Sequence, residues 1–284
     1  MLWEELAAPD FEKALKASKE VCVIPLGSME KHGPHLPVGM DTILARVVST
    51  EAAKLEPVVV FPDFYMGQMA GGEIYPGTIS VSNKLLLDVM EELCVQIRRS
   101  GFKKIIILSM HGGNPHFLRY FIQGTVKSKK DYVTYGYEPY TKWGEHYKTM
   151  LSDGVGGKLG LNEKDLKIID GLDKGVIDGS HASVPETSFM LSLRKDLVKI
   201  ERINDEDFNP KGKLEVLTSA GVFSWLWWYG NHPNSYAGDP EGSSERIGRA
   251  LTTLMVQDTA KIFSMVKEDT EGHMIQRNMF LWDA

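Results

Sequence analysis

The sequence predicts an α/β fold with a mostly parallel central sheet and helices on both of its faces. Short apolar runs alternate along the chain with longer segments whose apolar residues recur at helical spacing. The clearest run, residues 103–110 (KKIIILSM), is almost continuously apolar, which is typical of a strand buried on both faces. At 284 residues the chain has room for two domains, although α/β folds of this length often form one.

The same patterns locate the individual elements. Asp41 opens one helical segment and Asn114 immediately precedes another. Both residues are expected to act as N-caps. The Gly-rich stretch 139–178 is less periodic, with a helix expected around 163–169, and the segment after Pro185 is compatible with helix or strand. Strands are expected at 20–26, 58–61, 103–110 and 132–137, and helices at 41–56, 82–99, 115–130 and 241–267.

Composition narrows the class of protein. With 32 basic and 38 acidic residues the net charge is −6, which argues against a nucleic-acid partner. No stretch approaches the ~18 apolar residues of a membrane span, so no membrane partner is expected. Two cysteines exclude a disulfide framework and a thiolate zinc site, and the N-terminus lacks the pattern of a secretory signal. We therefore expect a cytoplasmic protein.

The loop after the first strand, residues 27–41 (GSMEKHGPHLPVGMD), contains candidate metal ligands. Glu30 and His32 are two residues apart, so in an extended segment both side chains lie on one face. Asp41 could bridge two ions, because its two oxygens can bind different metals. Carboxylate and imidazole ligands suit Zn, Mn or Fe. The simpler interpretation is that these are solvated loop residues.

Two further loops contain similar residues. His111 follows the buried strand at 103–110, where ligands of parallel sheets bind, although a structural role is equally compatible with the pattern. In residues 178–191, His181 could donate a proton and Glu186 could act as ligand or base. Alternatively, Glu186 is a carboxylate in the first turn of a helix, stabilised by the helix dipole.

Two other groups of residues are expected to be structural. His116, one turn into the helix at 115–130, is expected to pack or to face solvent. The aromatic residues near position 227 are expected in the core or at a subunit interface rather than as a platform for a sugar. They are Trp225, Trp227, Trp228 and Tyr229.

Taken together, four stretches of the sequence resemble the creatininase (creatinine amidohydrolase) family. They are GSMEKHGPHLPVGMD, GGEIYPGTIS, LSMHGGN and HASVPETS, and the resemblance spans nearly the whole chain. It implies a single domain over residues 1–284 with a three-layer α/β/α fold, commonly assembled as a homohexamer. It also implies two divalent metal ions per chain (Zn, Mn or Fe) and a small-molecule substrate.

The resemblance assigns roles to individual residues. Glu30, Asp41 and His111 would hold one ion; His32 and Asp41 would hold the other, with Asp41 bridging. Creatininase itself uses a further glutamate where this chain has Gly113, and family members with HGGN use the glutamate of HAxxxET instead, which is Glu186 here. His181 matches the family's proton-transfer histidine.

The expected activity is hydrolysis of a small cyclic amide or related C–N substrate by a metal-activated water. One alternative within the same chemistry is ring opening of a cyclic polyol diketone of the dehydro-inosose type. A second alternative is a metal-free binding protein with the same fold. That protein would have lost the metal ligands, whereas this chain retains all of them.

Overall fold

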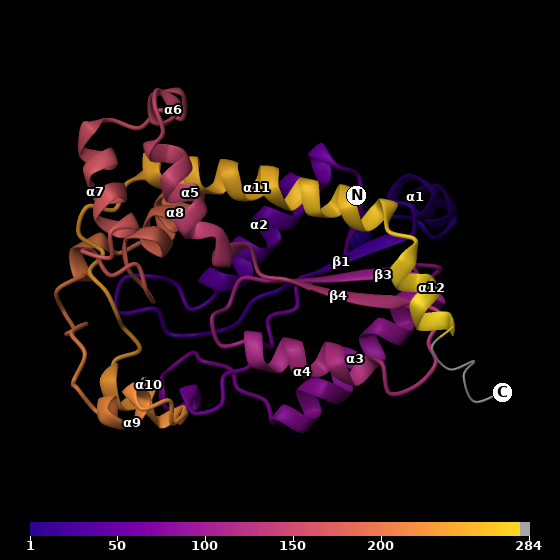
Figure 1. Cartoon of the computed structure of the whole chain (residues 1–284), viewed down its shortest axis with the longest axis horizontal. Coiled ribbons are helices and arrows are strands. Elements are labelled where there is room, and N and C mark those ends of the chain that lie inside the picture. The colour runs from indigo at the N-terminus through magenta and orange to yellow at the C-terminus, as the bar shows by residue number, and fades with distance from the viewer. Residues whose placement is uncertain (279–284) are drawn as a thin grey trace.

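The central sheet has four parallel strands in the order β2-β1-β3-β4 (Figure 1). A computed structural model describes residues 1–278 of the chain. The strands are β1 (Val21–Leu26), β2 (Val59–Val60), β3 (Lys104–Ser109) and β4 (Val133–Tyr137). All residues of β1 and β3 are buried, as their nearly continuous apolar sequences predict.

Helices cover both faces of the sheet, so the three-layer α/β/α expectation is confirmed (Figure 1). One core cluster joins the sheet to α2, α8 and α11, and the other joins it to α1, α3 and α4. None of the described helices is long and apolar enough to cross a bilayer. The helices are α1 (Phe11–Ser18), α2 (Met40–Leu55), α3 (Asn83–Arg99), α4 (Pro115–Thr125), α5 (Trp143–Leu151), α6 (Val155–Lys158), α7 (Glu163–Asp173), α8 (Val184–Arg194), α9 (Glu215–Ser219), α10 (Leu226–Asn231), α11 (Glu245–Glu268) and α12 (Glu271–Asn278).

Alternation along β3 shows why this strand is apolar throughout. Ile106 and Leu108 belong to the cluster under α2 and α11, whereas Ile105 and Ile107 belong to the cluster under α3 and α4. Because successive side chains point to opposite faces, a strand between two helical layers needs apolar residues at every position.

Most predicted elements are confirmed, with small shifts at their ends. The helix expected at 115–130 is shorter and ends at Thr125. The segment after Pro185, for which helix and strand were both open, is the helix α8. The region 139–178 is more helical than expected, because α5 and α6 precede the predicted α7. Their sequences are weakly periodic, and much helical stability comes from tertiary packing rather than from propensity.

The strand order places the ends of β1 and β3 at the centre of the molecule. The chain adds β2 on one side of β1 and then β3 on the other, so the direction of winding changes between β1 and β3. Their register pairs Leu26 with Ser109, so the loops that follow the two strands start side by side. Such a switch point, beyond the carboxyl ends of the strands, is where open parallel sheets bind ligands.

Candidate metal centre

Three chain segments bring metal-binding side chains together at this switch point. The loop after β1 contributes Glu30 and His32, and the loop after β3 contributes His111. The third segment contributes His181, which precedes α8, and Glu186, which lies in the first turn of α8; Asp41, at the end of the first loop, lies in the first turn of α2. The structure groups these side chains in three overlapping sets of potential ligands: Glu30, Asp41 and His111; His32, Asp41 and Glu186; Glu30, His32 and His181.

Asp41 lies between the first two sets. Its Oδ2 is 3.0 Å from Nδ1 of His111, and its Oδ1 is 3.3 Å from Nε2 of His32. The expectation that Asp41 caps α2 is wrong: Gly39 occupies the N-cap position, and its backbone carbonyl starts the helix. The buried Asp41 carboxylate instead accepts a hydrogen bond from the hydroxyl of Ser28 at 2.7 Å and faces two imidazoles.

His111 presents one nitrogen to the cluster and uses the other as an anchor. Its Nε2 donates to the carbonyl oxygen of Gln68 at 3.0 Å. Its Nδ1 lies 3.0 Å from Oε2 of Glu30 and equally far from Asp41. A backbone acceptor on the far nitrogen fixes the tautomer and the ring orientation, as it does for many metal-binding histidines.

His32 is arranged in the same way with its nitrogens exchanged. Its Nδ1 donates to the backbone carbonyl of Glu30 at 3.0 Å. Its Nε2 is buried, has no hydrogen-bond partner among the described residues, and lies 3.9 Å from Oε2 of Glu186. A buried unpaired nitrogen beside two carboxylates fits the donor set of a divalent cation such as Zn or Mn, so these residues fit the metal that the sequence predicts.

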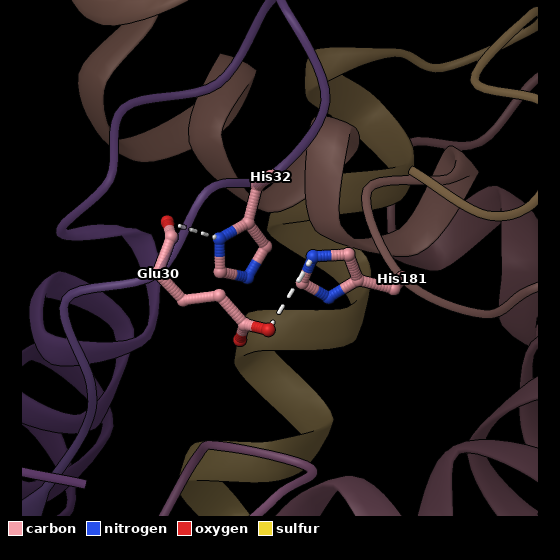
Figure 2. Close-up of side chains that lie close together, drawn as sticks. All are labelled: Glu30, His32 and His181. Atoms are coloured by element: carbon pink, nitrogen blue, oxygen red, sulfur yellow. Dashed lines mark hydrogen bonds and ion pairs between the residues drawn. The ribbon is translucent and has the colours of Figure 1, made fainter. Parts of the chain in front are cut away.

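His181 lies against His32, with 4.1 Å between the ring centroids, and Figure 2 shows both rings above the carboxylate of Glu30. The Nε2 of His181 donates to the carbonyl oxygen of Lys31 at 2.9 Å. Its Nδ1 is 4.0 Å from Oε2 of Glu186. That oxygen of Glu186 also accepts a hydrogen bond from the backbone N–H of Ala182 at 2.6 Å.

The acids and imidazoles of the cluster shift one another's pKa values. Burial opposes charge on every one of them, but opposite charges prevail at His32, where Asp41 raises the pKa to about 10. The pKa of Asp41 is held well below its usual range against burial by His32 and His111. Burial raises the pKa of Glu186, because its nearest imidazoles do not compensate fully. His32 and His111, whose pKa values are both raised by the carboxylates, therefore supply positive charge to those carboxylates, a role that a cation can take over.

Position 113, in the loop after β3, has no room for a side chain that could serve as a further ligand. A Cβ at Gly113 would lie 2.4 Å from Nε2 of His111 and 2.9 Å from the carbonyl oxygen of Gln68. This is the position at which creatininase is expected to have a glutamate. Asn114 makes no side-chain cap, contrary to expectation: it accepts from the N–H of Gln68 and donates to Ser109 instead.

A cavity of about 240 Å³ opens onto the cluster. Trp225, Trp228 and Tyr229 lie on its wall and outside both core clusters, so the core, one of the two places expected for these aromatics, is not where they lie. The concentration of aromatic residues at 223–229 was the available signal, but only the tertiary structure brings the segment to the cluster. The lining residues are Glu30, Met40, Asp41, Leu44, Gln68, Met69, Met110, His111, Gly112, Gly113, Tyr140, Trp143, Gly179, Ser180, His181, Glu186, Trp225, Trp228 and Tyr229.

Comparison with known proteins assigns the family. A family model described as "Creatininase: Creatinine amidohydrolase" matches residues 4–263. The chain belongs to the creatininase family. With buried sets of metal-binding side chains at the switch point, it is a metal-dependent hydrolase of that family.

Individual relatives agree with this family assignment. The creatinine amidohydrolase of Pseudomonas putida is 25% identical over 209 residues, which cover 71% of this chain and 75% of that protein. A mycofactocin precursor peptide peptidase of Mycobacterium ulcerans is 30% identical over 249 residues, covering 83% and 81% respectively. A crystal structure of creatininase matches with a TM-score of 0.72 at 20% identity, over 95% of this chain and 98% of that one. Other creatininase structures that share this fold are Zn–Zn and Mn forms.

Proposed function

We propose that this creatininase-family protein hydrolyses a C–N bond in a small amide, with two divalent ions bound in the cluster. The observation that carries the proposal is that two sets of three ligands share Asp41. Glu30, Asp41 and His111 would hold one ion, and His32, Asp41 and Glu186 the other. When bound, two such ions lower the pKa of a water and polarise the carbonyl of the substrate.

The protein's own residues then position the ligands and move the proton. The carbonyl oxygens of Gln68 and Glu30 hold His111 and His32 so that one nitrogen of each faces the carboxylates. His181 is anchored through Nε2 to Lys31, which leaves Nδ1 to carry a proton. We assign to that nitrogen the protonation of the leaving amine, so that the substrate gains one hydroxyl and one proton in total.

The third set, which includes His181, does not enter this proposal as a metal site. Nε2 of His181 is 2.9 Å from the carbonyl of Lys31 but 3.9 Å from Oε1 of Glu30. Its stronger interaction is therefore with the backbone. This leaves His181 beside the two shared sets, as a proton carrier requires.

Metal analysis tests the proposal first. Purified protein, reconstituted and then desalted, is expected to hold up to two equivalents of Zn, Mn or Fe per chain by elemental analysis. A reproducible value near zero would contradict the dinuclear site. A substrate panel of cyclic amides, formamides and cyclic polyol diketones, assayed on the metal-loaded protein, then tests the bond that is cleaved. If only the diketones are turned over, the proposed C–N hydrolysis is wrong and the activity is ring opening of a cyclic diketone.

A further inference from the structure

The wall of the cavity above the cluster carries no charge. Glu30, Asp41 and Glu186 lie at the metal-binding end, and no lysine or arginine is among the described residues that line the cavity. Away from the cluster the wall consists mainly of aromatic rings and methionines. A charged group on the distal part of a substrate would lose its hydration there without gaining a counter-ion, which weakens binding strongly.

The aromatic wall is fixed in place. The ring of Trp228 meets His181 edge to face, with centroids 5.5 Å apart, and packs on His232 at 4.9 Å. The hydroxyl of Tyr229 donates to the carbonyl oxygen of Ala70 at 3.0 Å. A Cβ at Gly71 would lie 2.5 Å from the Tyr229 ring, so the glycine permits this close approach. The wall therefore offers a preorganised apolar surface directly beside the proton-carrying histidine.

Two neutral polar groups on residues of the wall, the hydroxyl of Tyr140 and the indole N–H of Trp143, have no partner within residues 1–278. The hydroxyl of Tyr140 is buried and makes no hydrogen bond within residues 1–278. A buried hydroxyl without a partner costs free energy that a ligand oxygen would recover. A carbonyl oxygen of an uncharged substrate meets this need without adding a charge.

A second hollow continues the apolar surface away from the metal centre. It has a volume of about 340 Å³ and shares Gln68, Gly113 and Trp225 with the main cavity. Its other walls are mostly apolar and include Phe117 of α4 and Phe223. No acidic, lysine or arginine side chain lines it among the described residues. This groove adjoins the cavity at Trp225, which lines both, so a substituent that extends past Trp225 would enter it.

We infer that the substrates are uncharged amides that carry a flat apolar substituent, aryl or similar, which lies in the groove between Trp225 and α4. This inference rests on the proposed amide hydrolysis and narrows its substrate class. A polyol is disfavoured, because its hydroxyls would be buried against aromatic carbon with few partners. An amide with a negative charge on its substituent is disfavoured, because no lysine or arginine lines either hollow among the described residues and the metal-binding end is taken up by the amide group.

Three acetylated amines test the class by hydrolysis of the acetyl C–N bond, and the first two share an aniline leaving group. Acetanilide is neutral and aromatic, 4-acetamidobenzoate adds one negative charge to the same ring, and N-acetylglucosamine replaces the ring with a polyol. With metal-loaded protein, we expect kcat/KM for acetanilide to exceed the other two by about tenfold or more, the scale on which apolar pockets discriminate. Equal values, or a preference for either polar amide, would overturn the inference.

A variant of the groove tests the location. Phe223 is 72% exposed and packs beside His116 at 5.4 Å between ring centroids, so Phe223→Ser removes groove surface without opening the core. We expect Phe223→Ser to lower the ratio of kcat/KM for acetanilide to that for acetamide severalfold. The matched control is Leu55→Ser, an exposed apolar residue at the end of α2 and outside both hollows. If Phe223→Ser and Leu55→Ser have the same ratio of kcat/KM for acetanilide to that for acetamide, the groove does not bind the substituent.

A binding measurement separates failure of the inference from failure of the proposed function. If the metal-loaded protein hydrolyses none of the amides, amide hydrolysis is contradicted, and calorimetric titration decides the ligand class. Tighter binding of acetanilide than of 4-acetamidobenzoate would uphold an uncharged aromatic ligand. Equal binding, or no binding of either, would overturn it.

Discussion

Glu186 is the residue on which the second metal site depends. Its Oε2 lies between His32 and the backbone N–H of Ala182, and His181 is close by. Position 113 has no room for a ligand side chain, because a Cβ there would overlap His111. Without Glu186, only His32 and Asp41 would remain for that ion, whereas stable sites of this kind use about three protein ligands.

We therefore predict that Glu186→Gln loses the ion held by His32 and keeps the one held by Glu30 and His111. Activity should fall by more than about 100-fold. Removing a residue that only hydrogen-bonds a metal ligand usually costs about 10- to 100-fold, so a larger loss is expected for a ligand itself. The glutamine oxygen can still accept from Ala182, so the local fold should persist. Metal stoichiometry and melting temperature are the measurements.

The control for this variant is Glu245→Gln, because Glu245 is also a carboxylate in the first turn of a helix. If Glu186→Gln keeps both ions and only melts slightly earlier, as Glu245→Gln should, then Glu186 is a helix-start carboxylate worth about 0.3–1 kcal/mol and not a ligand.

His35 gives a prediction about acid stability. It is buried, and its Nε2 shares a 2.8 Å hydrogen bond with the hydroxyl of Thr187. Burial, together with the positive charge of His32 and His181, lowers the pKa of His35 from 6.5 to about 4. Between pH 6.5 and about 4 the unfolded chain takes up a proton here that the folded chain does not. His35 therefore reduces stability progressively as the pH falls through that window, by up to about 3 kcal/mol below pH 4.

The variant His35→Gln should consequently lose less stability on acidification than the unmodified protein does. Urea unfolding at pH 7 and at pH 4.5, with a chelator in all samples, measures how much unfolding free energy each protein loses between the two pH values. His116→Gln, at an exposed position, serves as the control for replacing a histidine. Parallel pH profiles for His35→Gln and the unmodified protein would refute the assignment.

At the scale of elements, the turn from β3 into α4 sets the geometry of the metal centre. Asn114 connects Gln68 to Ser109, and the carbonyl of Gln68 in turn holds His111. The turn is consequently fixed from both sides, and small changes within it should be transmitted to the ligand.

Two adjacent glycines in this turn allow a matched comparison. We predict that Gly113→Ala displaces the His111 ring, because its methyl group would overlap Nε2 and the Gln68 carbonyl. The expected cost is about 1–3 kcal/mol, the usual range for overpacking, with weaker binding of the ion held by Glu30 and His111. Gly112→Ala should be nearly neutral, because nothing lies within 4 Å of an added Cβ there. Thermal melts and metal titrations measure both effects, and equal behaviour of the two variants would contradict the prediction.

At the scale of the whole molecule, the end that carries the metal centre also carries exposed apolar residues. Val176 is 80% exposed, and Val216 and Leu226 on the neighbouring α9 and α10 are 84% and 70% exposed. In Figure 1 these short helices lie beyond the carboxyl ends of the strands, away from the main helical layers. Exposed apolar surface of this kind commonly marks an interaction site.

We predict that the chain forms a homo-oligomer, and a hexamer by its resemblance to the creatininase family. Light scattering coupled to size exclusion at micromolar concentration should then give six times the 31.8 kDa mass of one chain. A monomer at that concentration would contradict the prediction, and a dimer or tetramer would contradict the hexamer.

The sequence by itself determined the framework of this protein. The apolar runs of β1 and β3 identify buried strands, because a strand between two helical layers must be apolar on both faces. The loops after these strands were marked by their polar residues, and the family motifs named Glu30, His32 and His111 as candidates that the structure does bring together.

The tertiary structure decided the roles that depend on distant partners. Asp41 and Asn114 have the local pattern of helix caps, yet Asp41 faces His32 and His111, and Asn114 contacts Gln68. Local propensity describes only the interactions available within a few residues, and these partners lie up to 70 positions away along the chain. The cavity wall is decided in the same way. Only folding brings Trp228 against His181, which lies 47 positions earlier in the sequence. An aromatic side chain can pack on many apolar surfaces, so the local sequence does not specify its partner.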